Sequence, residues 1–195
     1  DPPDGLSVEM FIAMDPPKHD QQRKAVTPAV APSNLLLLEP TIRERACQIL
    51  DDLPIGEEFD WVDKVSIELT TMTLATLFDF PWEERRKLTR WSDVTTAAPE
   101  TGIVASYEAR REELIECAMY FKGLWDQRVN EPPRNDLISM MAHAPATKDM
   151  PFLEFLGNLL LLIVGGNDTT RNSISGGVLA LNQNPDEYRK LNDDP

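Results

Sequence analysis

The sequence predicts a mostly α-helical fold. Three observations support this: apolar residues recur at helical spacing in nearly every segment, prolines stand where helices would begin or end, and no convincing β-hairpin pattern occurs. With 195 residues, of which 42% are apolar, the chain is long enough for one domain with a sizeable core. Residues 1–195 are therefore expected to form a single domain.

The first predicted helix begins at Asp15-Pro16-Pro17, with Asp15 as the N-cap and Pro16 at the first helical position. It ends near Thr27-Pro28. A second helix opens at Pro32-Ser33-Asn34 and continues to Leu50, after which Ile55-Gly56 signals a turn.

A short extended piece is expected at residues 57–61. Residues 62–78 carry apolar side chains on successive turns and are predicted to form a buried helix. Pro81 ends this helix, and a basic, amphipathic helix follows over residues 82–97. A loop is expected at residues 99–104.

The second half of the chain is predicted to contain four helices. Residues 108–129 have a long amphipathic pattern, and residues 136–142 form a short helix. The main helix covers residues 152–182 and is roughly 45 Å long at its expected rise. Asn184 caps a last helix at residues 187–191.

The chain is acidic, since 33 Asp and Glu against 19 Lys and Arg give a net charge of −14. This charge repels phosphates and argues against nucleic-acid binding. The longest apolar run, residues 159–164, is too short to span a membrane, and no signal peptide is recognisable. Cys47 and Cys117 are expected to be reduced core thiols, as in a cytoplasmic protein. The chain lacks an initiator Met and both ends look cut, so an internal fragment is expected.

The most informative segment is Gly165-Gly166-Asn167-Asp168-Thr169-Thr170, which follows an apolar run inside the main helix. An acid and two hydroxyls there are expected to be buried, which is costly without partners. Gly165 leaves a notch one turn before Thr169, whose hydroxyl can bond the Gly165 carbonyl, and Asp168 could pass protons toward it. The alternative is a close helix crossing with Asp168 in a salt bridge.

His19 and Arg23 form a second candidate site. Their spacing of four residues places them on one helix face, where both could donate hydrogen bonds to an anion. The alternative is a solvated basic face. The only other histidine, His143, is not at metal-ligand spacing from His19 or either cysteine, so no metal site is predicted.

The two motifs together resemble those of the cytochrome P450 family. Residues 165–170 match its oxygen-activation motif, Ala/Gly-Gly-x-Asp/Glu-Thr-Thr/Ser, and residues 15–23 match its Asp-Pro-Pro-x-His-x-x-x-Arg helix. The resemblance covers essentially the whole chain and implies the central helical part of that fold, about helices C to I/J. The family's N-terminal sheet and its C-terminal haem-ligand region would be missing, so the axial cysteine is expected beyond the last residue and no metal ligand within this chain.

The resemblance implies haem b as cofactor and a role for each of eight residues. His19 and Arg23 would bind the haem propionates, and Gly165 and Gly166 would leave room for oxygen at the haem face. Asp168 and Thr169 would deliver protons. Leu161 and Val164 would contact the substrate.

A finer resemblance is to the soluble bacterial alkane-hydroxylating members of the family. It rests on residues 11–19, residues 79–86 and residues 165–173. It implies a monooxygenase that uses O2 to hydroxylate the end of medium-chain alkanes or fatty acids, with electrons from NAD(P)H delivered through a ferredoxin reductase and a ferredoxin. The fragment alone is expected to be inactive. Hydroxylation of steroids or terpenes stays an alternative, as do a non-catalytic helical lipid-binding module and a helical scaffold protein.

Overall fold

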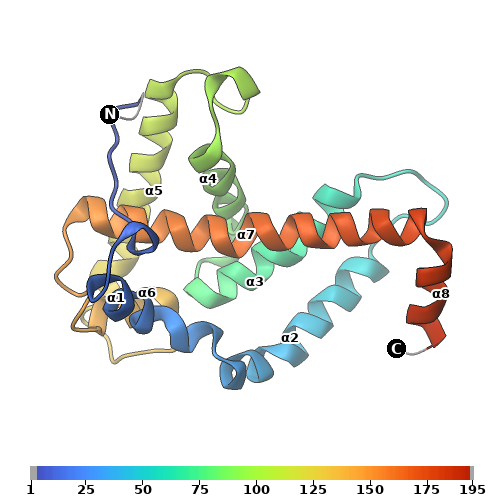
Figure 1. Cartoon of the computed structure of the whole chain (residues 1–195), viewed down its shortest axis with the longest axis horizontal. Helices are drawn as coiled ribbons and strands as arrows, with labels where there is room; N and C mark the ends of the chain where they lie inside the picture. The colour runs from blue at the N-terminus through green and yellow to red at the C-terminus, as the bar shows by residue number, and fades with distance from the viewer. Residues whose placement is uncertain (1–3, 194–195) are drawn as a thin grey trace.

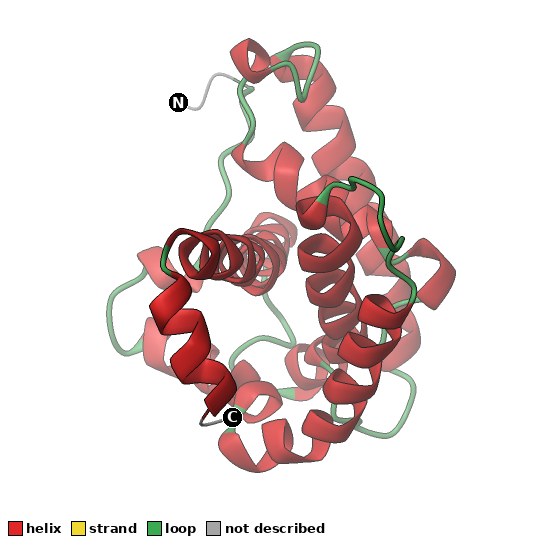
Figure 2. Ribbon diagram, turned by 90° about the vertical axis from the view of Figure 1, so that its right-hand side faces the viewer, coloured by secondary structure: helices red, strands yellow, loops and turns green. Residues whose placement is uncertain are grey.

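The computed structural model describes residues 4–193, and over this range every regular segment is helical (Figure 2). The predicted mostly α-helical fold is thus confirmed. The α-helices are, in chain order, α1 (Lys18–Val26), α2 (Pro32–Asp51), α3 (Glu68–Phe78), α4 (Arg86–Thr96), α5 (Tyr107–Arg128), α6 (Leu137–His143), α7 (Phe152–Gln183) and α8 (Pro185–Asp193).

Helix α7 runs across the middle of the molecule, and α3 and α4 pack against it (Figure 1). Its first half belongs to the core, since Leu156, Leu159 and Ile163 are fully buried. From Thr169 onward its residues are exposed or only half-buried. The helix therefore leaves the core just after Asn167, within the segment of glycines, acid and hydroxyls that follows the run of leucines.

A cluster of aromatic rings lies in the core where α3 ends against α4 and α5. The rings of Phe78 and Phe121 meet edge to face at 5.3 Å, and Phe80 lies 5.4 Å from Phe121 and 6.1 Å from Trp91. Full burial of such a side chain contributes about 1.5–3 kcal/mol. This cluster joins the end of α3 to α4 and α5.

Most of the predicted element bounds agree with the structure to within two residues, but three expectations are corrected. The side chain of Asp15 does not cap α1, whose cap position is Pro17; Asp15 accepts the His19 N–H through its backbone carbonyl instead. Residues 57–61 do not pair as a strand. The helix predicted from residue 62 begins as a π-helical segment, η3 (Val62–Ile67).

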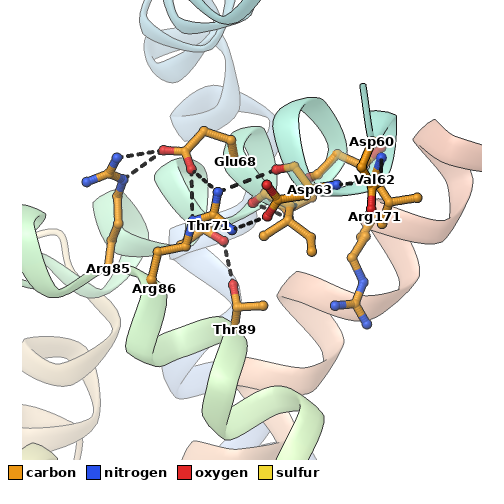
Figure 3. Close-up of polar contacts among 12 residues, drawn as sticks. Asp60, Val62, Asp63, Glu68, Thr71, Arg85, Arg86, Thr89 and Arg171 are labelled. Atoms are coloured by element: carbon orange, nitrogen blue, oxygen red, sulfur yellow. Dashed lines mark hydrogen bonds and ion pairs between the residues drawn. The ribbon is translucent and has the colours of Figure 1, made fainter. Parts of the chain in front are cut away.

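Polar contacts hold η3 and α3 against α4 (Figure 3). Glu68 accepts from Arg85 at 2.6 Å and from Arg86 at 2.7 Å, and Arg86 also reaches Asp63 at 3.0 Å. Deeper in the same interface the buried hydroxyls of Thr71 and Thr89 are 2.6 Å apart. Because Glu68 is only 14% exposed, its two arginine partners compensate for a charge that would otherwise be costly to bury.

The two cysteines differ in environment. Cys117 is fully buried, as expected, and burial raises the pKa of its thiol. Cys47 is exposed on α2, so the prediction that it is a core thiol is wrong. The reason is that the surface of α2 next to Cys47, including Leu36 and Leu50, has no covering element among residues 4–193. Over the same residues no helix is long and apolar enough to cross a membrane.

Candidate functional site

Thr169 and Gly165 form an open notch on α7. The Thr169 hydroxyl donates to the Gly165 carbonyl at 3.0 Å, which is the bond that their spacing suggests. Both residues are exposed, and a Cβ added to Gly165 would meet no atom within 4 Å among the described residues. A reactant could therefore approach the helix backbone here, next to a hydroxyl group.

The burial of this motif differs from the expectation. Thr169 and Thr170 are exposed, and the side chain of Asp168 is 40% exposed. The fully buried polar residue of the motif is Asn167. The apolar residues on the preceding turns of α7 suggested that all of residues 165–170 are buried. That apolar pattern, however, reports only on the turns of α7 that lie inside the core.

Asp168 is held by an arginine that also reaches another helix. Arg171 donates to Asp168 at 2.5 Å and to Asp93 of α4 at 3.0 Å, and Asn172 lies 3.3 Å from the other Asp168 oxygen. Desolvation lowers the pKa of Arg171, but its bonds to the two carboxylates outweigh that effect and raise it. The salt bridge that the sequence left as an alternative is present, and it coexists with the open notch.

The two glycines of the motif have different surroundings. Gly165 faces open space, whereas a Cβ on Gly166 would lie 2.7 Å from the Cδ1 methyl of Leu74 on α3. Gly166 thus permits close packing of α3 on α7, and the notch belongs to Gly165. Leu161 and Val164, the predicted substrate contacts, are both half-buried on the preceding turns of α7.

Helix α1 presents His19 and Arg23. His19 Nδ1 is 2.7 Å from Asp20, its ring lies 6.4 Å from that of Phe11, and Nε2 has no partner among residues 4–193. Arg23 is exposed, and within the same residues its guanidinium forms no ion pair. Both side chains are consequently able to donate hydrogen bonds to an anion.

A buried polar network fastens α1 to the first turns of α7. Gln22, which is 2% exposed, donates to Glu154 and accepts from Asn158 at 2.9 Å. Glu154, which is 4% exposed, also binds Lys18 at 2.8 Å, and Asn158 accepts the backbone N–H of Phe11 at 2.8 Å. The network links the helix of His19 and Arg23 to the helix of Asp168 and Thr169.

The chain before α1 also touches α7 directly. Glu9 passes over Gly157, where an added Cβ would overlap the Glu9 carbonyl oxygen and lie 2.7 Å from its carbon. Only glycine therefore allows this crossing.

Comparison with known proteins gives the family. No family model matches the chain. It is 34% identical to linalool 8-monooxygenase from Pseudomonas putida, over 95% of its own length and 46% of that protein's length. It is 33% identical to a steroid C26-monooxygenase from Mycolicibacterium smegmatis, over 94% of its own length and 42% of that protein's length. The solved structure of CYP153D17 from Sphingomonas sp. PAMC 26605 superposes with a TM-score of 0.88 and 49% identity, covering 100% of this chain and 49% of that one.

The chain belongs to the cytochrome P450 family. It spans about half the length of the relatives it matches, and the match covers the helical part of the cytochrome P450 fold, as expected. In this cytochrome P450 chain one motif lies on α1 and the three residues before it, and the other lies on α7. The two helices are joined through Gln22, Glu154 and Asn158.

The sequence did not predict the buried polar network that joins α1 to α7 in this cytochrome P450 chain. A signal was present, because Glu154 and Asn158 are polar residues four apart in an apolar stretch, and so share one face of the helix. Their partner Gln22 could not be identified, since nothing local relates it to residues more than 130 positions later.

Proposed function

We propose that the complete protein containing this chain is a haem-thiolate monooxygenase, which inserts one oxygen atom of O2 into an unactivated C–H bond. The observation that carries the proposal is the open notch of Gly165 and Thr169 beside the half-exposed Asp168, on a helix fastened to the one that bears His19 and Arg23. Family membership supports it, because relatives matched over nearly the whole chain are named monooxygenases.

The residues of the chain fit haem b as cofactor. Arg23 and His19 Nε2 are hydrogen-bond donors without partners among residues 4–193, which suits the two propionates of a haem edge. Gly165 offers a flat approach to α7. When bound through a cysteine thiolate supplied by the rest of the protein, haem provides the redox chemistry that activates O2.

The contribution of this chain would be proton delivery. Asp168 is in contact with solvent and next in sequence to Thr169, whose hydroxyl lies on the open face. We infer that Asp168 takes protons from water. Because the Thr169 hydroxyl donates to the Gly165 carbonyl, we infer that its oxygen accepts a hydrogen bond from a water that carries the proton to the reacting oxygen. Arg171 holds the Asp168 carboxylate and so limits its conformations.

The substrate we propose is a medium-chain alkane or fatty acid, hydroxylated at its end. Support comes from the resemblance of residues 11–19, 79–86 and 165–173 to the alkane-hydroxylating subgroup. Leu161 and Val164 are apolar and half-buried on the turns before the notch. Burial of an alkyl chain against such residues yields about 0.8 kcal/mol per CH₂.

A terpene or steroid substrate is the second candidate, favoured by the names of the linalool and steroid relatives. Incubating the reconstituted complete protein with octane, a fatty acid, linalool and a steroid, followed by product analysis, separates the two. Terminal alcohols from octane or the fatty acid support our choice. Products from linalool or the steroid alone would replace it, and absence of bound haem would favour a non-catalytic lipid-binding module.

Electrons would come from NAD(P)H through a ferredoxin reductase and a ferredoxin, in the cytoplasm where NAD(P)H is abundant. Helix α1 offers positive charge to an acidic ferredoxin. Lys18 is engaged by Glu154 at 2.8 Å and Glu9 at 3.6 Å, and Arg23 is assigned to a haem propionate, so the free positive charge of this helix resides on the exposed Lys24.

A further inference from the structure

Asn167 is the polar residue of the 165–170 motif that faces the protein interior. It is 0% exposed, and its side chain points to α3, where the Thr70 hydroxyl lies 3.1 Å from Asn167 Oδ1. Thr70 is itself buried, and the single proton of its hydroxyl is shared between Asn167 Oδ1, the Ser66 carbonyl at 2.9 Å and the Ile67 carbonyl at 3.1 Å. A second hydrogen bond across the same interface joins Ser175 to Ser66 at 2.8 Å.

Stability does not explain an asparagine at this position. Within residues 4–193 its Nδ2 is buried without a partner, and an unsatisfied donor of this kind costs about 1–3 kcal/mol. The preceding inward positions of α7, Leu160 and Ile163, are apolar and buried. A leucine at position 167 would avoid the unsatisfied amide.

The bond to Thr70 does, however, fix the rotation of α7 about its own axis. Successive residues of an α-helix are roughly 100° apart. With Asn167 held toward α3, Asp168 points about 100° away and Thr169 about 200° away, toward the open side of the helix. Gly166, against Leu74, lets α3 come close enough for this bond to form.

We propose that Asn167 is a positioning residue for proton delivery: its hydrogen bond to Thr70 sets the direction in which α7 presents Asp168 and Thr169. This rests on the proposed monooxygenase function and adds a residue outside the reacting groups. Without the bond, α7 can turn slightly, the Thr169 hydroxyl moves from the reacting oxygen, and reducing equivalents end as hydrogen peroxide instead of product.

The test uses the complete, haem-loaded protein with Asn167→Leu, Thr70→Val and the double variant. Haem content, melting temperature, and product and peroxide per NAD(P)H are measured. Asn167→Leu is expected to keep its haem and to melt no lower than the wild type, yet to release several-fold more peroxide per product. Thr70→Val should release more peroxide in the same way, but it should melt at a lower temperature, because it leaves the buried Asn167 amide without its partner. In peroxide release the double variant should be no worse than either single variant.

Ser175→Ala is the matched control, because it removes a similar bond from the same interface, two turns further along α7. It should leave the peroxide-to-product ratio unchanged. Wild-type coupling in Asn167→Leu and Thr70→Val would overturn the inference, as would equal uncoupling in Ser175→Ala or additive effects in the double variant. A wild-type protein that binds no haem and forms no product would instead refute the proposed function.

Discussion

Replacing Gly157 by alanine tests how the chain before α1 is held on α7. The added methyl would overlap the Glu9 carbonyl oxygen and lie 2.7 Å from its carbon and 3.2 Å from its nitrogen. All three are backbone atoms, so no side-chain rotation can relieve the overlap. Segment 9–11 must move away from α7, which strains the bond from Phe11 N–H to Asn158.

The expected cost follows from two opposing terms. Alanine in a helix interior is favoured over glycine by about 1 kcal/mol. Overpacking that displaces backbone costs about 1–3 kcal/mol or more, and loss of the Phe11–Asn158 bond would add about 1 kcal/mol. Gly157→Ala should therefore destabilise by about 1–3 kcal/mol in total.

Gly123→Ala is the control, since Gly123 also lies inside a helix but a Cβ there would meet no atom within 4 Å. It should stabilise by up to about 1 kcal/mol. Both variants of the complete protein are compared by urea unfolding and by haem content. Gly157→Ala should also bind haem less tightly, because α1 carries His19 and Arg23, the residues we propose for the haem propionates. Equal free energies of unfolding of the two variants would show that segment 9–11 is not in close contact with α7 at Gly157.

Two further predictions concern polar contacts. Burial and a hydrogen bond to Glu84 raise the pKa of Tyr120 to about 12, above the ordinary value of 10.0. The stability that the neutral Tyr120 hydroxyl contributes is therefore complete below pH about 10 and is lost as the pH rises toward 12. Melting temperature should fall less steeply across this range in Tyr120→Phe, and an unchanged slope would contradict the assignment. Asp93→Asn removes one of the two carboxylates on Arg171 and should cost about 1 kcal/mol in urea unfolding, whereas no loss would mean that solvent screens the α4–α7 bridge.

The sequence was sufficient for the helices and for the two motifs, because both are local patterns. The apolar period placed residues 152–182 in one helix, and the structure gives Phe152–Gln183. It was insufficient for which side of that helix is covered, since burial depends on elements far away in sequence. The inward position of Asn167 and the exposure of Thr169 could therefore be seen only from the way α3 packs on α7 in the structure.

The same limit applies to charge partners. A contact between Arg171 and Asp168 could be expected, because the two residues are three positions apart on one helix. The second partner of Arg171, Asp93, is 78 positions away in the sequence and could not. Likewise Gln22 and Glu154 meet across 132 positions. Such contacts follow from the tertiary arrangement, which residue spacing alone does not specify.

Proton delivery by Thr169 is tested most directly by the ratio of hydrogen peroxide to oxygenated product in Thr169→Ala, measured in the complete protein with its redox partners. Thr170→Ala, which removes a neighbouring exposed hydroxyl, is the control. Thr169→Ala should retain haem and consume NAD(P)H but release most of the electrons as peroxide, while Thr170→Ala should stay closer to the wild type. Wild-type coupling in Thr169→Ala would contradict the role of the notch at Gly165 and Thr169 in oxygen activation.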